Sequence, residues 1–137
     1  MTVIIASTIV GVLSNIKLNK ITDKDTKATL VKDFIKLKSI VRKAEESRQE
    51  IIDKFRTDWA EEIPVIDKLR MNKESVEEHK EFLEAEKDVF KMINDIFSEE
   101  VEVELTPVDL DKFVNAVDDE GLTLEAIAFL QENGVIV

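Results

Sequence analysis

The sequence lacks cysteine altogether, and only one of its 137 residues is a histidine, His79. Without cysteine the chain has no disulfide bonds, no thiolate ligands for zinc and no thiol nucleophile. A single histidine excludes metal sites that need several imidazoles. Glycine and proline number only three and two, while 44% of the residues are hydrophobic. This balance excludes collagen-like and low-complexity chains, and the length predicts one domain over residues 1–137.

A hydrophobic run long enough to cross a membrane is also missing. The longest candidate, residues 3–13, has 11 residues, whereas a spanning helix needs about 20. No Lys or Arg precedes this run, so the charged start of a signal peptide is missing. We therefore expect a buried first element in a cytoplasmic protein that makes no membrane contact.

Positive charge is scarce in the second part of the chain. Residues 1–56 carry 12 Lys or Arg and 7 Asp or Glu, a net charge of +5. Residues 57–137 carry 7 and 23, a net charge of −16, which gives −11 for the whole chain. Because every contact with a nucleic acid phosphate needs a cation, this surplus argues against direct binding of nucleic acid. We expect a mildly basic element packed against an acidic one.

The strongest pattern in the sequence predicts a long helix over residues 23–56. Apolar residues recur there at alternating intervals of four and three, which is typical of a helix that packs along one partner. Thr22 or Asp23 can cap its start. At about 1.5 Å per residue the helix would span about 50 Å, so we expect an elongated domain. The stripe consists of Leu30, Phe34, Leu37, Val41, Ala44, Arg48, Ile51 and Phe55.

A second stripe with the same spacing predicts another long helix over residues 75–98. Ser75 opens a capping-box pattern, although the helix could instead begin near Pro64. Two long helices joined by the junction at residues 57–74 should pack antiparallel. The members of this second stripe are Val76, His79, Leu83, Glu86, Phe90, Ile93 and Phe97.

Two short segments alternate apolar and polar residues, which is the pattern of a half-exposed strand. They are residues 16–20 and 101–105. Lysines in the first and glutamates in the second favour pairing between them. The predicted fold is therefore mostly α (α+β): a long antiparallel helical hairpin with a small two-stranded sheet.

The ends of the chain complete this fold. Residues 3–14 are rich in β-branched side chains, which favours a strand, but the spacing of their apolar residues fits a helix, which we prefer. Two short helices are expected near the C-terminus. The first carries Leu110 and Phe113, and the second begins after Thr123, which can cap it.

Signs of catalysis or ligand binding are missing. No phosphate-binding or nucleophile-elbow motif occurs, and His79 lies on the second stripe without a zinc-binding motif around it. The acidic run at residues 118–121 fails as a calcium loop, because Ala116 and Ile127 would occupy positions that need carboxylates. We expect no enzyme, no cofactor and no metal.

Arg48 and Glu86 are the charged residues within the two stripes. If the predicted helices run antiparallel, Arg48 faces the region of Glu86. We hypothesise a buried or half-buried ion pair that fixes the register of the hairpin, since desolvation offsets most of the attraction. Alternatively, both side chains lie at the edge of their stripes and extend into water.

Four segments resemble small uncharacterised proteins encoded by tailed bacteriophages and prophages, a domain-of-unknown-function family. The resemblance implies a phage-related role without enzymatic activity. The segments are Ile-Lys-Leu-Asn-Lys at residues 16–20, Glu-Glu-Ser-Arg-Gln-Glu-Ile-Ile-Asp-Lys-Phe at 45–55, Glu-Val-Glu-Val-Glu-Leu at 100–105 and Leu-Thr-Leu-Glu-Ala-Ile-Ala-Phe-Leu at 122–130.

The expected function is a non-enzymatic protein-interaction module, an accessory or assembly protein of a phage or prophage. Its partner would be a protein, including another copy of the chain, in the bacterial cytoplasm or on the virion. The alternative is an inhibitor that mimics DNA and competes for a host DNA-binding protein, for which the predicted second helix offers an acidic face. That face consists of Glu74, Glu77, Glu78, Glu81, Glu84, Asp88 and Asp95.

Overall fold

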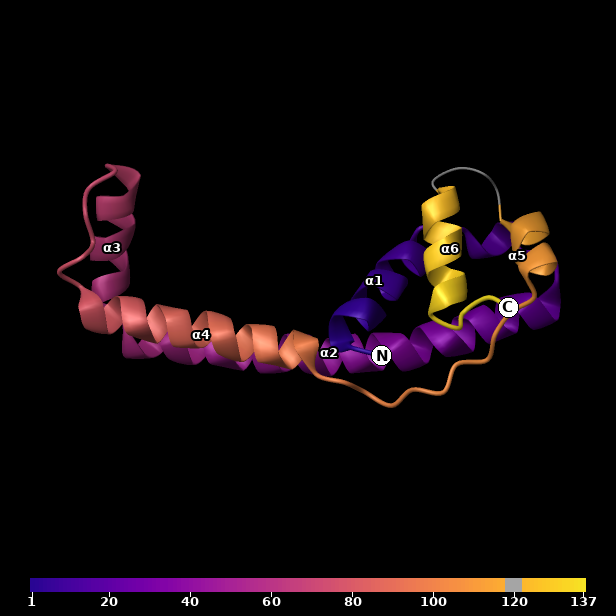
Figure 1. Ribbon diagram of the computed structural model, residues 1–137, viewed down its shortest axis with the longest axis horizontal. Coiled ribbons are helices and arrows are strands. Elements are labelled where there is room, and N and C mark those ends of the chain that lie inside the picture. Colours follow the sequence, from indigo (N-terminus) through magenta and orange to yellow (C-terminus); the bar gives the residue numbers. More distant parts are fainter. Residues whose placement is uncertain (118–121) are drawn as a thin grey trace. The chain divides into compact units, whose positions relative to one another are not determined.

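The computed structural model describes residues 1–117 and 122–137, and over this part of the chain it is helical (Figure 1). The mostly α character predicted from the sequence is confirmed. In chain order the elements are α1 (Val3–Ser14), the 3-10 helix η1 (Leu18–Lys20), α2 (Lys24–Asp58), α3 (Glu62–Met71), α4 (Lys80–Ser98), α5 (Leu110–Ala116) and α6 (Leu124–Glu132).

The chain divides into two compact units. Unit 1 comprises Met1–Arg42 and Glu100–Val137, and unit 2 comprises Lys43–Glu99. Helix α2 begins in unit 1 and ends in unit 2, since it runs from Lys24 to Asp58. The long helix predicted over residues 23–56 is therefore present, and it contributes to two separate sets of contacts.

Short polar side chains set where the helices begin. The Oδ2 atom of Asp23 accepts hydrogen bonds from the backbone N–H of Thr26 at 3.0 Å and from its hydroxyl at 2.6 Å. These bonds, the one from the hydroxyl above all, hold the pKa of Asp23 below its usual value. The predicted cap at Thr123 is confirmed, because its Oγ1 accepts from Ala126 N–H at 3.1 Å. Such caps satisfy backbone donors that the first turn leaves free.

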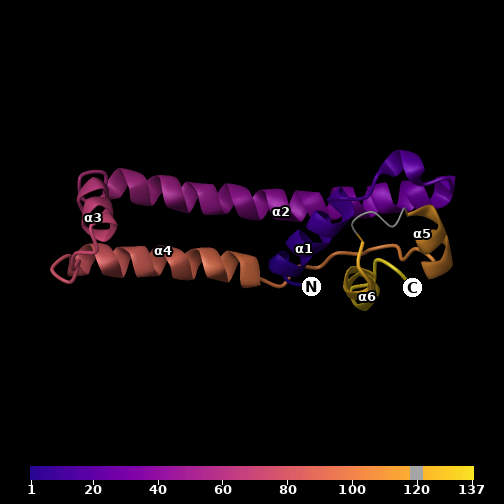
Figure 2. The same cartoon turned by 90° about the horizontal axis from the view of Figure 1, so that it is seen from above.

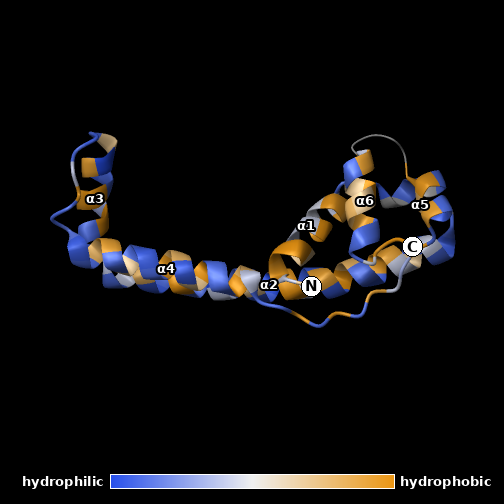
Figure 3. Ribbon diagram, viewed as in Figure 1, coloured by the Kyte–Doolittle hydropathy of each residue, from blue (hydrophilic) through white to orange (hydrophobic). Residues whose placement is uncertain are grey.

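Unit 1 has a continuous hydrophobic core. Helices α1, α5 and α6 gather along the N-terminal part of α2 (Figure 1), and α1 is coloured largely hydrophobic in Figure 3. The helix preferred for residues 3–14 is confirmed, because its buried face outweighs the strand propensity of its β-branched residues. The fully buried members of the core include Ala6, Ile9, Leu37, Phe113, Leu130, Val135 and Ile136.

The predicted two-stranded sheet is wrong. Residues 18–20 form the 3-10 helix η1, and residues 101–105 form no strand. Within the described residues, β-type pairing is limited to two isolated bridges. They join Thr2 to Glu100 and Val108 to Ile136.

The alternation at residues 101–105 has a different cause. Val103 and Leu105 pack against the core of unit 1, while Glu102 and Glu104 are exposed. The segment thus buries one side against helices, and an extended chain does this with the same period of two as a strand. One side chain of α2 contacts its backbone, because the Nζ of Lys36 donates to the carbonyl of Glu104 at 2.9 Å.

Unit 2 consists of the C-terminal part of α2 with α3 and α4. The two longer helices run in opposite directions, with α3 between them in the chain (Figure 2). Helix α4 begins at Lys80, so the start predicted at Ser75 is wrong. The alternative start near Pro64 is also wrong, because Pro64 belongs to the separate helix α3. The Ser75 hydroxyl accepts from the N–H of Glu77 at 3.3 Å, and this local turn takes the place of a helical cap.

Candidate functional site

An aromatic cluster organises unit 2. The ring of Phe82 lies 5.4 Å from that of Phe55 and 5.7 Å from that of Trp59, measured between centroids. The second pair is nearly perpendicular, at 84°, which is a favourable edge-to-face geometry. Phe82 is 3% exposed and is buried together with Ile66 of α3. These ring contacts join the C-terminal end of α2 and the residue just after it to the start of α4.

Beyond this cluster, α4 leaves much of its apolar surface accessible. Phe90 is 65% exposed and Met92 is 50% exposed. Phe82 is the one residue of α4 that is fully buried, and Leu83, Val89, Ile93, Ile96 and Phe97 are half-buried. The rest of unit 2 covers only part of this apolar face, and such a wide face normally requires a further layer.

Glu86 takes part in an ion pair, but with a different partner from the one hypothesised. The guanidinium of Arg70 on α3 donates to both carboxylate oxygens of Glu86, at 2.8 and 2.7 Å. This bidentate geometry is the strongest form of such a pair. The hydrogen bonds from Arg70 lower the pKa of Glu86 and raise that of Arg70.

Arg48 pairs along its own helix instead of reaching Glu86. Its Nη1 lies 3.3 Å from Oε2 of Glu45, one turn earlier, and both side chains are about half exposed. The hypothesised register pair between Arg48 and Glu86 is therefore wrong, because the carboxylate of Glu86 is bound by Arg70 of α3. Sequence reasoning missed Arg70, since the junction at residues 57–74 carried no pattern that placed it.

One side of α4 is a row of carboxylates. Glu81, Glu84, Asp88 and Asp95 are exposed, and their spacing of three, four and seven residues puts them on the same side of the helix. The more N-terminal residues of the predicted acidic face, Glu74, Glu77 and Glu78, precede α4. The predicted acidic face is therefore helical only in part.

Unit 1 contains a buried acid that sequence reasoning missed. Asp33 of α2 is 0% exposed, its Oδ1 accepts from the N–H of Thr106 at 3.0 Å, and its Oδ2 has no hydrogen-bond partner. Burial raises the pKa of Asp33, an effect that the Thr106 bond and nearby Lys36 partly offset. The sequence did contain a signal for the burial of Asp33. This residue lies three residues after Leu30 and four before Leu37, beside the apolar stripe.

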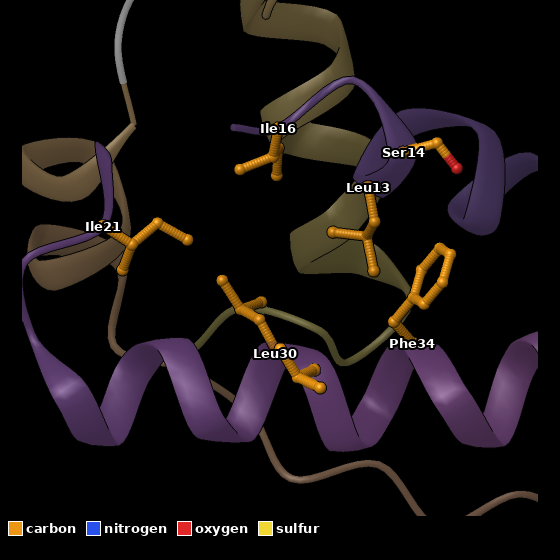
Figure 4. A pocket seen from close by; sticks show the side chains of 7 residues that line it. Leu13, Ser14, Ile16, Ile21, Leu30 and Phe34 are labelled. Carbon is orange, nitrogen blue, oxygen red and sulfur yellow. The ribbon is translucent and has the colours of Figure 1, made fainter. Parts of the chain in front are cut away.

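An apolar hollow of about 230 Å³ lies in unit 1, between α1, the following loop and α2. In Figure 4 the side chains of Leu13, Ile16, Ile21 and Leu30 surround this space. Ser14 supplies a hydroxyl, but this hydroxyl already donates to the carbonyl of Val10 at 2.6 Å. The hollow can therefore accept apolar groups but offers nothing to orient a polar substrate.

The remaining predictions concern metal and histidine chemistry. The described residues hold no group of three acidic or histidine ligands suited to a metal ion. His79 precedes α4 and lines a shallow hollow with Trp59, Glu62 and Glu78. The acidic run at residues 118–121 lies outside the described residues.

Neither the family models nor the curated proteins nor the solved structures gave a match to this chain. Among the helices described, none combines the length and the apolar character that crossing a membrane requires.

Proposed function

We propose that the protein is a non-enzymatic interaction module that binds another protein through its helices. We further propose that it serves a tailed phage or prophage as an accessory or assembly factor. The resemblance of four sequence segments to phage-encoded proteins supports the proposed role in a phage or prophage. The proposed binding of another protein rests on the surface of unit 2.

The exposure of Phe90 carries this proposal. A phenylalanine in the middle of an amphipathic helix, 65% exposed, sits beside half-buried Val89 and Ile93. Large apolar side chains that gather on an exposed helix face commonly mark protein-binding sites. Aromatic residues also supply much of the binding energy in such interfaces.

The test uses the full-length protein as bait in lysate of the bacterial host. Captured proteins are identified by mass spectrometry, purified and titrated against wild type and Phe90→Ser. We expect the substitution to weaken binding at least tenfold, as loss of an aromatic anchor does. Leu124→Ser is the matched control, because Leu124 is 86% exposed but lies in unit 1. Equal binding by all three proteins would contradict the proposal.

The row of carboxylates on α4 favours a second candidate, an acidic inhibitor that competes with DNA for a host protein. Regularly spaced negative charge on a helix can occupy a surface that binds phosphates. Such binding would fall steeply as salt is added, and DNA would displace it. Binding that changes little with salt and is indifferent to DNA would favour the interaction module.

A further inference from the structure

A surface of α2 within unit 1 combines one exposed apolar side chain with two cations. Ile35 is 60% exposed, and Lys38 and Arg42 are exposed beside it. Their spacing of three and four residues places them on one side of the helix. We call this surface the basic ridge. A shallow hollow of about 270 Å³ adjoins it, lined by the ridge together with Phe34 and Ser39.

The two cations of the basic ridge are available for binding. Within the described part of the chain, neither Lys38 nor Arg42 has an ion pair with a carboxylate. By contrast, Lys36 on the same helix is held by the Glu104 carbonyl. The ridge therefore presents a small apolar site framed by positive charge, which fits an apolar group flanked by acids.

Helix α4 carries a surface with that chemistry, which we call the acidic ridge. Met92 is 50% exposed, and Asp88 and Asp95 are exposed one turn before and one turn after it. Intervals of four and three residues put the three on one side of α4. Methionine is flexible and polarisable, so it fills irregular hollows well.

The order of apolar and charged side chains along the two ridges is complementary when the helices run in opposite directions. Placing Met92 over Ser39, beside the hollow, brings Asp88 towards Arg42 and Asp95 towards Lys38. The two acids are seven residues apart and the two cations four, or about 10 Å and 6 Å along their helices. The long side chains of Lys and Arg can span this difference.

We propose that the basic ridge of one copy of this protein binds the acidic ridge of a second copy. This inference rests on the proposed function and names the partner. Because the two ridges differ, the contact is heterologous, so each copy offers one free ridge to the next. Association then continues into rings or filaments, which suits a protein that acts in assembly.

The experiment measures the mass of the full-length protein by light scattering over a range of concentrations, at about 50 mM and about 500 mM salt. We expect wild type to gain mass with concentration at low salt and to lose it at high salt. Two charge-reversal variants, Lys38→Glu with Arg42→Glu and Asp88→Lys with Asp95→Lys, should each associate at least tenfold more weakly. Circular dichroism checks that both variants are folded.

Mixing the two variants gives the decisive result. Each ridge then meets one of opposite charge on the other variant, so the mixture should regain the association that both variants lost separately. The control is Lys54→Glu with Arg56→Glu, which makes the same change in net charge at exposed positions of α2. This control should associate like wild type.

Three outcomes would overturn the inference. They are a monomeric wild type at every concentration, association that neither reversal weakens, and a mixture that stays monomeric. A monomer that still binds a host protein through Phe90 would refute self-association and leave the proposed function standing. A monomer that binds no protein would refute both. If Asp88→Lys with Asp95→Lys abolishes only binding to a DNA-binding protein, the acidic ridge serves that partner instead.

Discussion

The two units of this protein bury their apolar residues to very different extents. Unit 1 covers its core from several sides, and Ile9, Leu37 and Phe113 are almost completely inaccessible. Unit 2 has only Ala44, Ile66 and Phe82 fully buried, and it leaves Phe90 largely exposed. Since burial of apolar surface is the main stabilising force, we infer that unit 1 supplies most of the stability. Unit 2 leaves large apolar side chains such as Phe90 and Met92 at least half exposed.

The largest expected effect is at Phe113, in the core of unit 1. Phe113→Ala removes a ring that is 0% exposed and should lower the free energy of unfolding by about 3–5 kcal/mol. Urea denaturation followed by circular dichroism measures this change. Leu124→Ala in the neighbouring helix α6 is the control and should shift stability by less than about 0.5 kcal/mol. Comparable effects of the two substitutions would show that Phe113 is not part of the core of unit 1.

A second substitution tests whether unit 2 depends on its aromatic cluster. Phe82→Ala removes the ring that contacts Phe55 and Trp59, and should destabilise unit 2 by about 3 kcal/mol. Trp59 is the only tryptophan, so its fluorescence reports on this unit. We expect its transition to move to lower denaturant. Phe90→Ala, at an exposed site on the same helix, should leave the transition in place.

The buried acid of unit 1 predicts a dependence of stability on pH. Because burial raises the pKa of Asp33, the unfolded chain loses this proton at lower pH than the folded chain does. The contribution of Asp33 to stability is therefore full below the pKa of an unfolded aspartate, roughly 4, and is lost as pH rises through the higher folded pKa.

Two variants separate the charge of Asp33 from its hydrogen bond. Asp33→Asn can still accept from Thr106 N–H, so its stability relative to wild type should improve as pH rises from about 4 to about 7. Asp33→Ala leaves that N–H without its acceptor and should cost about 1–3 kcal/mol at neutral pH. Thermal unfolding across this range measures both variants. If the stability of Asp33→Asn relative to wild type stays constant between about pH 4 and about pH 7, the charge carries no cost. Equal losses in both variants at neutral pH would mean that the hydrogen bond from Thr106 contributes nothing.

The smallest effect is expected at the ion pair in unit 2. The side chains of Arg70 and Glu86 are 43% and 22% exposed, so solvent screens their attraction, and Arg70→Met should cost about 1 kcal/mol or less. Arg70 lowers the pKa of Glu86. The stabilisation is therefore present above the pKa of an unfolded glutamate and lost as pH falls through the lower folded value. A loss in Arg70→Met that persists unchanged in strong acid would contradict this origin.

The parts of the fold that depend on local pattern were predictable from the sequence. The apolar repeat from Leu30 to Phe55 predicted the body of α2, and its start was narrowed to a cap at Thr22 or Asp23, because neighbouring residues along a helix decide both. The alternation at residues 101–105 was misread, since it shows that one side of an extended chain is buried without showing what covers it. Whether a strand or a helix lies opposite depends on contacts distant in sequence.

The candidate surfaces were predictable only in part, for the same reason. The exposed acids of α4 follow from helical spacing alone. Phe90 belonged to a stripe that was expected to be buried, and its exposure depends on how little of α4 the rest of unit 2 covers. Arg70 reaches Glu86 because α3 is a helix, and nothing within residues 57–74 indicated where that helix would place its side chains.

Hydrogen exchange of the backbone amides, compared between the two units, most directly tests the claim that unit 1 is well buried and unit 2 is not. In the monomeric protein at high salt, we expect amides of α4 to exchange at least a hundredfold faster than those of α1, because unit 2 opens without unit 1 unfolding. Binding of a partner should slow exchange in α4 and leave α1 unchanged. Equal protection of both helices in the monomer would contradict the account, since unit 2 would then need no partner to be stable.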